Sequence, residues 1–108
     1  MDYTIRDSLG NTAVIRDQGA ELKSFCTGGE EYIWQGEPGH WEESAPFLFP
    51  IASNVRGDQV WIEGKPYAMG QHGFARKLCW SLIRKEEDSA AFCLRETPAT
   101  LACYPFRF

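Results

Sequence analysis

Short runs of β-prone residues, each ended by glycine, asparagine, aspartate or proline, divide this chain, and their spacing constrains the fold more than any other feature. These runs span residues 3–6, 12–16, 20–26, 31–34, 59–62, 65–69, 78–82 and 90–94. Leu78, Trp80 and Leu82 alternate with smaller side chains, as do Ala90, Phe92 and Leu94, which is the period of a strand with one buried face and one drier or polar face. No segment carries a sustained helical period. The sequence therefore predicts a mainly β protein made of antiparallel hairpins.

Residues 35–50 interrupt this pattern. The segment holds three prolines together with Trp41, Phe47 and Phe49, and proline fixes φ and removes a backbone donor. We expect a long irregular loop, with one helical turn over residues 41–44, that packs its aromatic side chains over the sheet. Aromatic residues make up 14% of the chain. Their usual role is core packing, and the alternative is stacking on a sugar ring.

Charge and cysteine spacing exclude several functions. A net charge of −4 without any cluster of Lys or Arg argues against nucleic-acid and membrane partners. No apolar run is long enough to span a bilayer. No two of the four cysteines have zinc-type spacing, so we expect no metal. Residues 1–6 lack the apolar region of a signal peptide, which predicts a cytoplasmic chain with free thiols.

Two histidines are candidates for chemistry. His72 lies in Gly70-Gln71-His72-Gly73, where glycine allows a tight turn and close approach of a ligand. Arg76 follows four residues later and Arg56 precedes it, and a converging His and Arg suit a hydroxyl-rich ligand. The alternative is that His72 caps a turn and both arginines pair with surface carboxylates. We interpret His40 as a loop residue and the pair Glu42-Glu43 as a solvated face.

The last residues, 104–108, are apolar and aromatic, and we expect them to begin another strand. A chain ending on such a strand presents an unpaired edge. This pattern predicts that residues 1–108 are the N-terminal portion of a single, longer domain. It also leaves open a homodimer formed by pairing this edge with a second copy.

Two sequence blocks carry a resemblance to a known family. Residues 45–51, Ala-Pro-Phe-Leu-Phe-Pro-Ile, are followed after a hairpin by residues 67–76, which end in His-Gly-Phe-Ala-Arg. Together with residues 31–36 and Trp41, they resemble the aldose 1-epimerase family, in particular its LacX-like branch. The resemblance covers the whole chain. Either block alone would be weakly specific, but the two at this spacing are fairly specific.

The resemblance implies antiparallel sheets forming part of a galactose mutarotase-like β-supersandwich. In this family the α and β anomers of an aldose interconvert by acid–base ring opening, without a cofactor or obligatory metal. His72 matches a catalytic histidine that hydrogen-bonds the sugar near the reacting oxygens. By the same resemblance, and from their place around His72, we expect Asn54, Arg56 and Arg76 to bind the sugar with it.

The chain departs from the family pattern in two ways. The second family histidine, in a His-Pro motif, and the catalytic glutamate have no counterpart in residues 1–108, so we expect this chain to be inactive alone. Ser53-Asn54 stands where the family often has Gly-Arg, which leaves open whether Arg56 replaces that arginine. The alternative function is a non-catalytic sugar-binding module.

Overall fold

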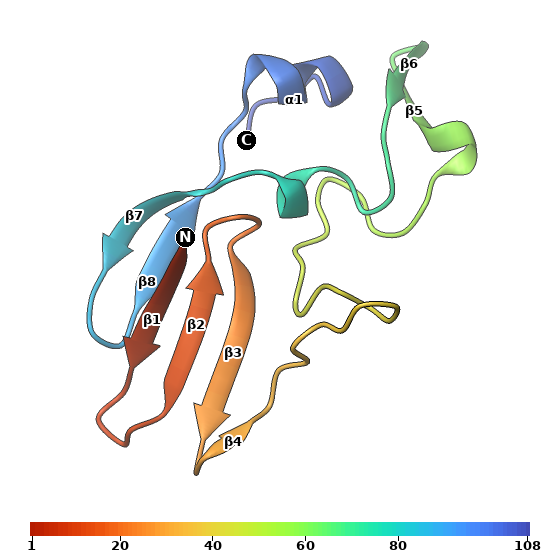
Figure 1. The fold of residues 1–108 in the computed structure, drawn as a ribbon. Coiled ribbons are helices and arrows are strands. Elements are labelled where there is room, and N and C mark those ends of the chain that lie inside the picture. The colour runs from red at the N-terminus through yellow and green to blue at the C-terminus, as the bar shows by residue number, and fades with distance from the viewer.

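A computed structural model describes residues 1–108, and the chain forms eight strands with one short α-helix (Figure 1). The elements are β1 (Asp2–Arg6), β2 (Thr12–Arg16), β3 (Glu21–Thr27), β4 (Glu30–Glu31), β5 (Gln59–Ile62), β6 (Lys65–Ala68), β7 (Ser81–Lys85), β8 (Ala90–Cys93) and α1 (Pro98–Cys103), with 3-10 turns η1 (Arg56–Asp58) and η2 (Ala75–Lys77). The mainly β, antiparallel prediction is confirmed. No helix is long and apolar enough to cross a bilayer.

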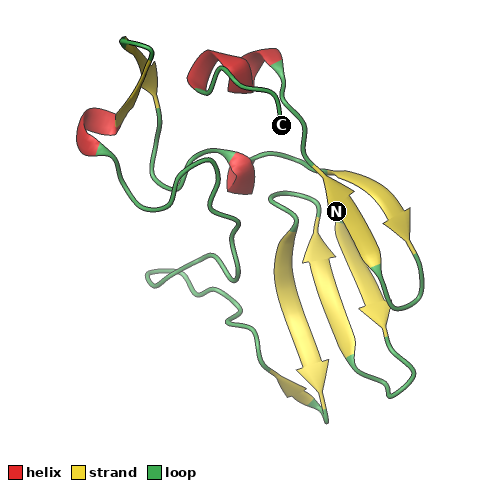
Figure 2. Ribbon diagram, turned by 180° about the vertical axis from the view of Figure 1, so that it is seen from behind, coloured by secondary structure: helices red, strands yellow, loops and turns green.

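The first four strands form an antiparallel sheet in the order β1-β2-β3-β4. Its register places Tyr3 opposite Ile15 and Ile5 opposite Ala13, so that apolar side chains share one face. The β7–β8 hairpin lies beside β1 (Figure 1), where the rings of Tyr3 and Phe92 meet edge to face at 5.6 Å. Seen from behind, the strands of the sheet gather on one side and β5, β6 and the helical turns on the other (Figure 2).

A crossing of two loops links these halves of the molecule. The carbonyl of Phe49 accepts hydrogen bonds from the backbone N–H groups of Phe74 (2.9 Å) and Ala75 (3.2 Å). Gly73 lies directly against this carbonyl, and a Cβ there would overlap it. The ring of Phe49 also packs against Phe108 (5.2 Å) and Tyr104 (5.9 Å). The crossing therefore joins three segments: residues 35–50 (the proline-rich loop), the turn at residues 70–73 that carries His72, and the C-terminal residues 104–108.

The helical turn expected over residues 41–44 is wrong. The segment is irregular, and the Ser44 N–H bonds to a side chain of the sheet rather than to the preceding turn. The Glu21 carboxylate on β3 accepts the N–H groups of Ser44 (2.5 Å) and Ala45 (3.1 Å). The indole of Trp34 donates to the Trp41 carbonyl at 2.6 Å. The loop is held against β3 by these polar contacts, whereas the aromatic side chains of Trp41 and Phe47, predicted to pack over the sheet, are exposed.

Two strand predictions are displaced, one by a neighbouring side chain and one by a turn that is distant in the sequence. Of the run over residues 31–34, only Glu31 lies in a strand, at the end of β4, because the Ile33 N–H bonds to the Glu31 carboxylate. The strand predicted over residues 78–82 forms as β7, three residues later. Residues 78–80 instead pair with the turn after β2, through Gly19 N–H to Leu78 O (2.7 Å) and Trp80 N–H to Asp17 O (2.9 Å).

The strand expected at the C-terminus is also wrong. Residues 98–103 form α1, which begins with a capping box between Thr97 and Thr100 and has Pro98 in its first turn. Residues 104–108 follow as an irregular segment whose rings pack on Phe49 and Phe74. The edge strand expected to pair with a second copy is therefore not formed.

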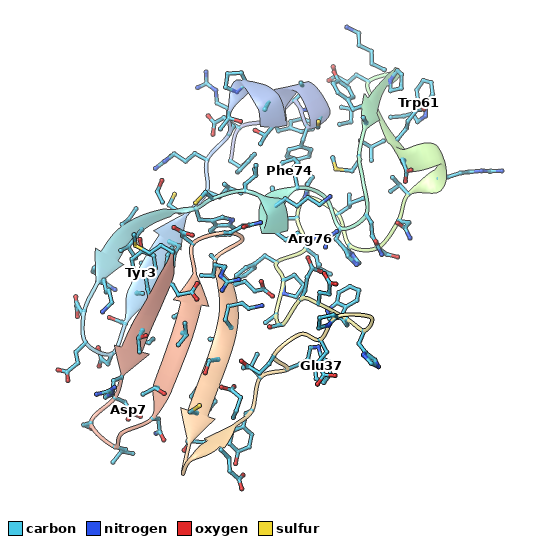
Figure 3. The ribbon with its side chains drawn as sticks, viewed as in Figure 1. Tyr3, Asp7, Glu37, Trp61, Phe74 and Arg76 are labelled. Atoms are coloured by element: carbon cyan, nitrogen blue, oxygen red, sulfur yellow. The ribbon has the colours of Figure 1, made fainter.

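Little of the chain is buried. Six of 108 residues are buried, and no large side chain is fully buried. The radius of gyration is 16.4 Å, against about 13 Å for a compact domain of this length. The accessible surface of 7396 Å² exceeds the roughly 6,100 Å² of a compact monomer of this mass. Apolar side chains such as Trp61 are exposed as a result (Figure 3).

Glu31 fastens the β3–β4 edge. Its carboxylate accepts hydrogen bonds from Ser24, from Cys26 Sγ (3.2 Å) and from the N–H groups of Phe25 (2.9 Å) and Ile33 (2.8 Å). These donors, led by the Ser24 hydroxyl, favour the ionised form and lower the pKa of Glu31 to about 2. An unfolded glutamate has a pKa near 4.5. The contribution to stability is therefore complete above that value and is lost as the pH falls toward 2.

The first prediction concerns the crossing. Gly73→Ala should lower the free energy of unfolding more than Gly10→Ala, because both glycines have positive φ but only Gly73 has an atom within contact distance of the added Cβ. Gly10→Ala should cost about 1–2 kcal/mol. Gly73→Ala should lose a further ~1–3 kcal/mol through overpacking. Urea unfolding followed by circular dichroism measures both; equal losses would show that the crossing is not tight.

The second prediction concerns Glu31. Glu31→Gln should lower the unfolding temperature at pH 7, because an amide cannot accept from all four donors. The difference from the parent should shrink as the pH falls from about 5 toward 2. Glu30→Gln is the matched control, since that neighbouring carboxylate accepts only one contact, at 3.2 Å from Tyr32. A difference that stays constant across this pH range would contradict the assignment.

Candidate functional site

His72 occupies a tight turn between β6 and η2. The Gly73 N–H donates to the Gly70 carbonyl at 3.1 Å, and His72 itself has a φ of +60°. Such left-handed backbone is uncommon for a residue with a Cβ and is tolerated where surrounding contacts hold it. The side chain is half-buried. The turn thus presents an imidazole at a fixed place beside the crossing.

Two reciprocal hydrogen bonds join this turn to Ser53. The His72 N–H donates to the Ser53 carbonyl (2.9 Å), and the Ser53 N–H donates to His72 Nδ1 (2.7 Å). Ser53 also has a positive φ, +67°. The other ring nitrogen, Nε2, makes no hydrogen bond to the protein. Sequence spacing does not point to this role of Ser53, because 19 residues separate it from His72.

Arg76 lies on η2 and faces the proline-rich loop (Figure 3). Its guanidinium forms an ion pair with Glu43 and a 3.3 Å hydrogen bond to the Gln71 carbonyl. Both partners of the pair are largely buried, with 14% of the Arg76 side chain exposed and 27% of Glu43. Arg76 Nε and Glu43 Oε2 are buried without a hydrogen-bond partner. Glu43 is therefore not part of a solvated face, which corrects the interpretation made from the sequence.

Asn54 and Arg56 follow Ser53 and are both exposed. Asn54 is placed beside the His72 turn by its neighbour's two hydrogen bonds. Arg56 opens η1, and no hydrogen bond or ion pair links it to His72 or Arg76. The structure thus joins His72 to the Ser53–Asn54 turn. It joins Arg76 to the same region through the Gln71 carbonyl.

A charged groove of about 220 Å³ runs beside Arg76. It is lined by Arg16, Gln18, Glu21, Lys23, Glu42, Glu43 and Arg76, none of them apolar. His72 does not line this groove. Lys23 lies 3.6 Å from Glu21, so the groove's charges are largely paired with one another. Its members come from β2 and the turn after it, β3, the loop and η2, and their convergence could not be read from sequence spacing.

His40, the cysteines and the carboxylates are the further candidates for chemistry or metal binding. His40 is exposed and lies 3.9 Å from Glu37, in keeping with its interpretation as a loop residue. The four cysteines are all free. No three His, Cys, Asp or Glu side chains converge closely enough to hold a metal ion.

Solved structures similar to this chain share its fold. An X-ray structure of a galactose mutarotase related enzyme from Lactobacillus acidophilus is 38% identical and has a TM-score of 0.94. A galactose mutarotase-like protein from Lactobacillus casei is 34% identical, also with a TM-score of 0.94. Each match covers 99% of this chain, but only 36% and 37% of the respective solved chains. The sheets described above therefore form part of a galactose mutarotase-like fold.

Sequence comparison leads to the same group. Protein LacX of Lactococcus lactis subsp. lactis, in its chromosomal form, is 34% identical over 103 residues, or 90% of this chain. The chain spans about a third of the length of the curated relatives it matches, 34% in this case. The sequence profile of aldose 1-epimerase matches residues 1–108. With fold and sequence in agreement, this mutarotase-like, carbohydrate-related chain belongs to the aldose 1-epimerase family.

Proposed function

We propose that residues 1–108 supply the sugar-contacting histidine of a protein that interconverts the α and β anomers of an aldose by acid–base ring opening. One observation carries the proposal. In a member of this family, His72 is held half-buried with Nδ1 bonded to the Ser53 N–H and with Nε2 free of protein partners. A fixed imidazole with one unengaged nitrogen is suited to hydrogen-bond a hydroxyl or ring oxygen.

Under this proposal the other predicted residues have different roles. Asn54, next to Ser53, carries an amide that can donate to and accept from sugar hydroxyls. Arg56 is exposed and unpaired, so its guanidinium is available to a ligand that reaches η1. Arg76 is already engaged by Glu43 and the Gln71 carbonyl. Its proposed contribution to sugar binding is therefore the support of the turn that carries His72, together with any contact its remaining N–H groups make.

Catalysis needs more than this chain contains. Ring opening requires an acid for the ring oxygen and a base for the anomeric hydroxyl, each typically worth ~10²–10⁴-fold. Residues 1–108 contain no His-Pro pair, and no carboxylate is hydrogen-bonded to His72. We therefore propose binding by this chain and catalysis only when the further residues of the family site are present. A sugar-binding module without catalysis is the second candidate, favoured by the same lack of an acid–base pair.

A chimera tests the mutarotase proposal. Residues 1–108 would replace the matching third of the Lactobacillus acidophilus enzyme, and mutarotation of galactose and glucose would be followed by polarimetry. The chimera should be active, and His72→Gln should lower kcat/KM by ~10²–10⁴-fold. His40→Gln is the matched control and should leave the rate unchanged.

The 108-residue chain should show no rate above buffer in the same assay. A folded chimera without activity would contradict the proposal, as would full activity in the His72→Gln chimera. Chemical-shift changes at His72 on sugar titration, combined with an inactive chimera, would instead support the binding module.

A double-mutant cycle tests the supporting role of Arg76. Glu43→Gln and Arg76→Met should couple by roughly 1–3 kcal/mol in the free energy of unfolding, because the pair is largely buried. The exposed pair Arg84–Glu86, at 3.7 Å and more than half exposed on each side, is the control. Its coupling should be about 0–1 kcal/mol. Coupling no larger than in the control would leave Arg76 free to act chiefly on a ligand.

A further inference from the structure

The contact between Ser53 and His72 does more than position the imidazole. Ser53 and His72 face each other with positive φ values of 67° and 60°. Their backbones and one side chain exchange hydrogen bonds of 2.9 and 2.7 Å. Two left-handed residues in direct contact are costly to hold. The shorter of the two bonds reaches the imidazole ring itself.

The direction of that hydrogen bond determines which ring nitrogen of His72 carries the hydrogen. A backbone amide can only donate, so Nδ1 must accept and therefore carries no hydrogen. A neutral imidazole has one N–H, which must then be on Nε2. We propose that the Ser53 backbone N–H locks His72 as the Nε2–H tautomer and so makes it a hydrogen-bond donor to its ligand. Ser53 is thus a positioning residue that acts through His72.

This inference rests on the proposed function and specifies the hydrogen-bonding role of His72 within it. An Nε2–H group recognises an acceptor, such as the ring oxygen of a sugar or the lone pair of a hydroxyl. Neutral His72 cannot take a proton at Nε2, and taking one at Nδ1 would break the bond from Ser53. His72 is therefore restricted to donating a hydrogen bond toward a sugar oxygen, and a separate group must serve as the base.

The side chain of Ser53 is not required for this role. The donor is its backbone N–H, and the residue is exposed. Ser53→Gly keeps that N–H and adopts positive φ more readily, so it should preserve the tautomer. Proline would remove the N–H but cannot adopt a φ of +67°, so Ser53→Pro would disrupt the turn. Replacing the amide of residue 53 by an ester removes the N–H and changes the shape least.

Nitrogen-15 NMR of the 108-residue chain tests the proposal without any ligand. Long-range proton–nitrogen correlations on histidine-labelled protein distinguish the two ring nitrogens. The measurement is made at a pH where the spectrum itself shows no imidazolium form of either ring. His72 should appear as the Nε2–H tautomer alone. His40, exposed and without a backbone donor on its ring, is the internal reference and should show a mixture.

Two results would overturn the inference. One is a His72 spectrum that shows the Nδ1–H form or matches the mixture of His40. The other is an ester variant at residue 53 that keeps its far-ultraviolet circular dichroism and still shows a single Nε2–H tautomer. Ser53→Gly should give the parent spectrum. Titration with galactose in the same sample tests the proposed function separately, because sugar binding can fail while the tautomer is as stated.

Discussion

The close crossing of residues 49–53 over residues 72–75 is the contact on which the rest of this structure depends. At one point the Phe49 carbonyl accepts two backbone N–H groups, which is possible because Gly73 has no side chain to fill the space. A few residues further along each segment, Ser53 and His72 exchange two more hydrogen bonds. Four backbone donors are satisfied within this small region, which makes it rigid without a large apolar core.

Polar contacts fasten the remaining long segments. The Glu21 carboxylate accepts backbone N–H groups of the proline-rich loop, and an ion pair between Glu43 and Arg76 joins that loop to η2. The Glu31 carboxylate accepts hydrogen bonds at the β3–β4 edge. This arrangement fits a molecule with six buried residues and principal extents of 53 × 33 × 17 Å. Because few residues are buried, hydrogen bonds and ion pairs hold the site region in shape together with the ring contacts of Phe49, Phe74 and Phe108. The same contacts bring His72 and Arg76 into one region from a turn and a 3-10 segment.

Local sequence pattern predicted the elements that depend on local contacts. Strands β2 and β5 form over the predicted residues, since their β-prone side chains and flanking turns suffice. The prediction was wrong where a group distant in the sequence bonds to the backbone. The turn after β2 pairs with residues 78–80, and the Glu21 carboxylate accepts the N–H groups of Ser44 and Ala45. The helix at residues 98–103 was missed although its capping residues, Thr97 and Thr100, with Pro98 at the first position, are readable in the sequence. The strand prediction rested on the aromatic residues 104–108 that follow and not on the capping residues before them.

The sequence by itself determined the strand-and-turn character of the chain and its family, and it pointed to His72, in a glycine-rich turn, as the candidate site residue. These follow from side-chain period, turn residues and two adjacent motifs, all of which are local along the chain. Only the tertiary structure decided that Ser53 binds the ring of His72, that Glu43 pairs with Arg76, and that Arg56 stays apart from both. The physical reason is that these contacts join residues 19 and 33 positions apart, and their geometry exists only once the loops cross.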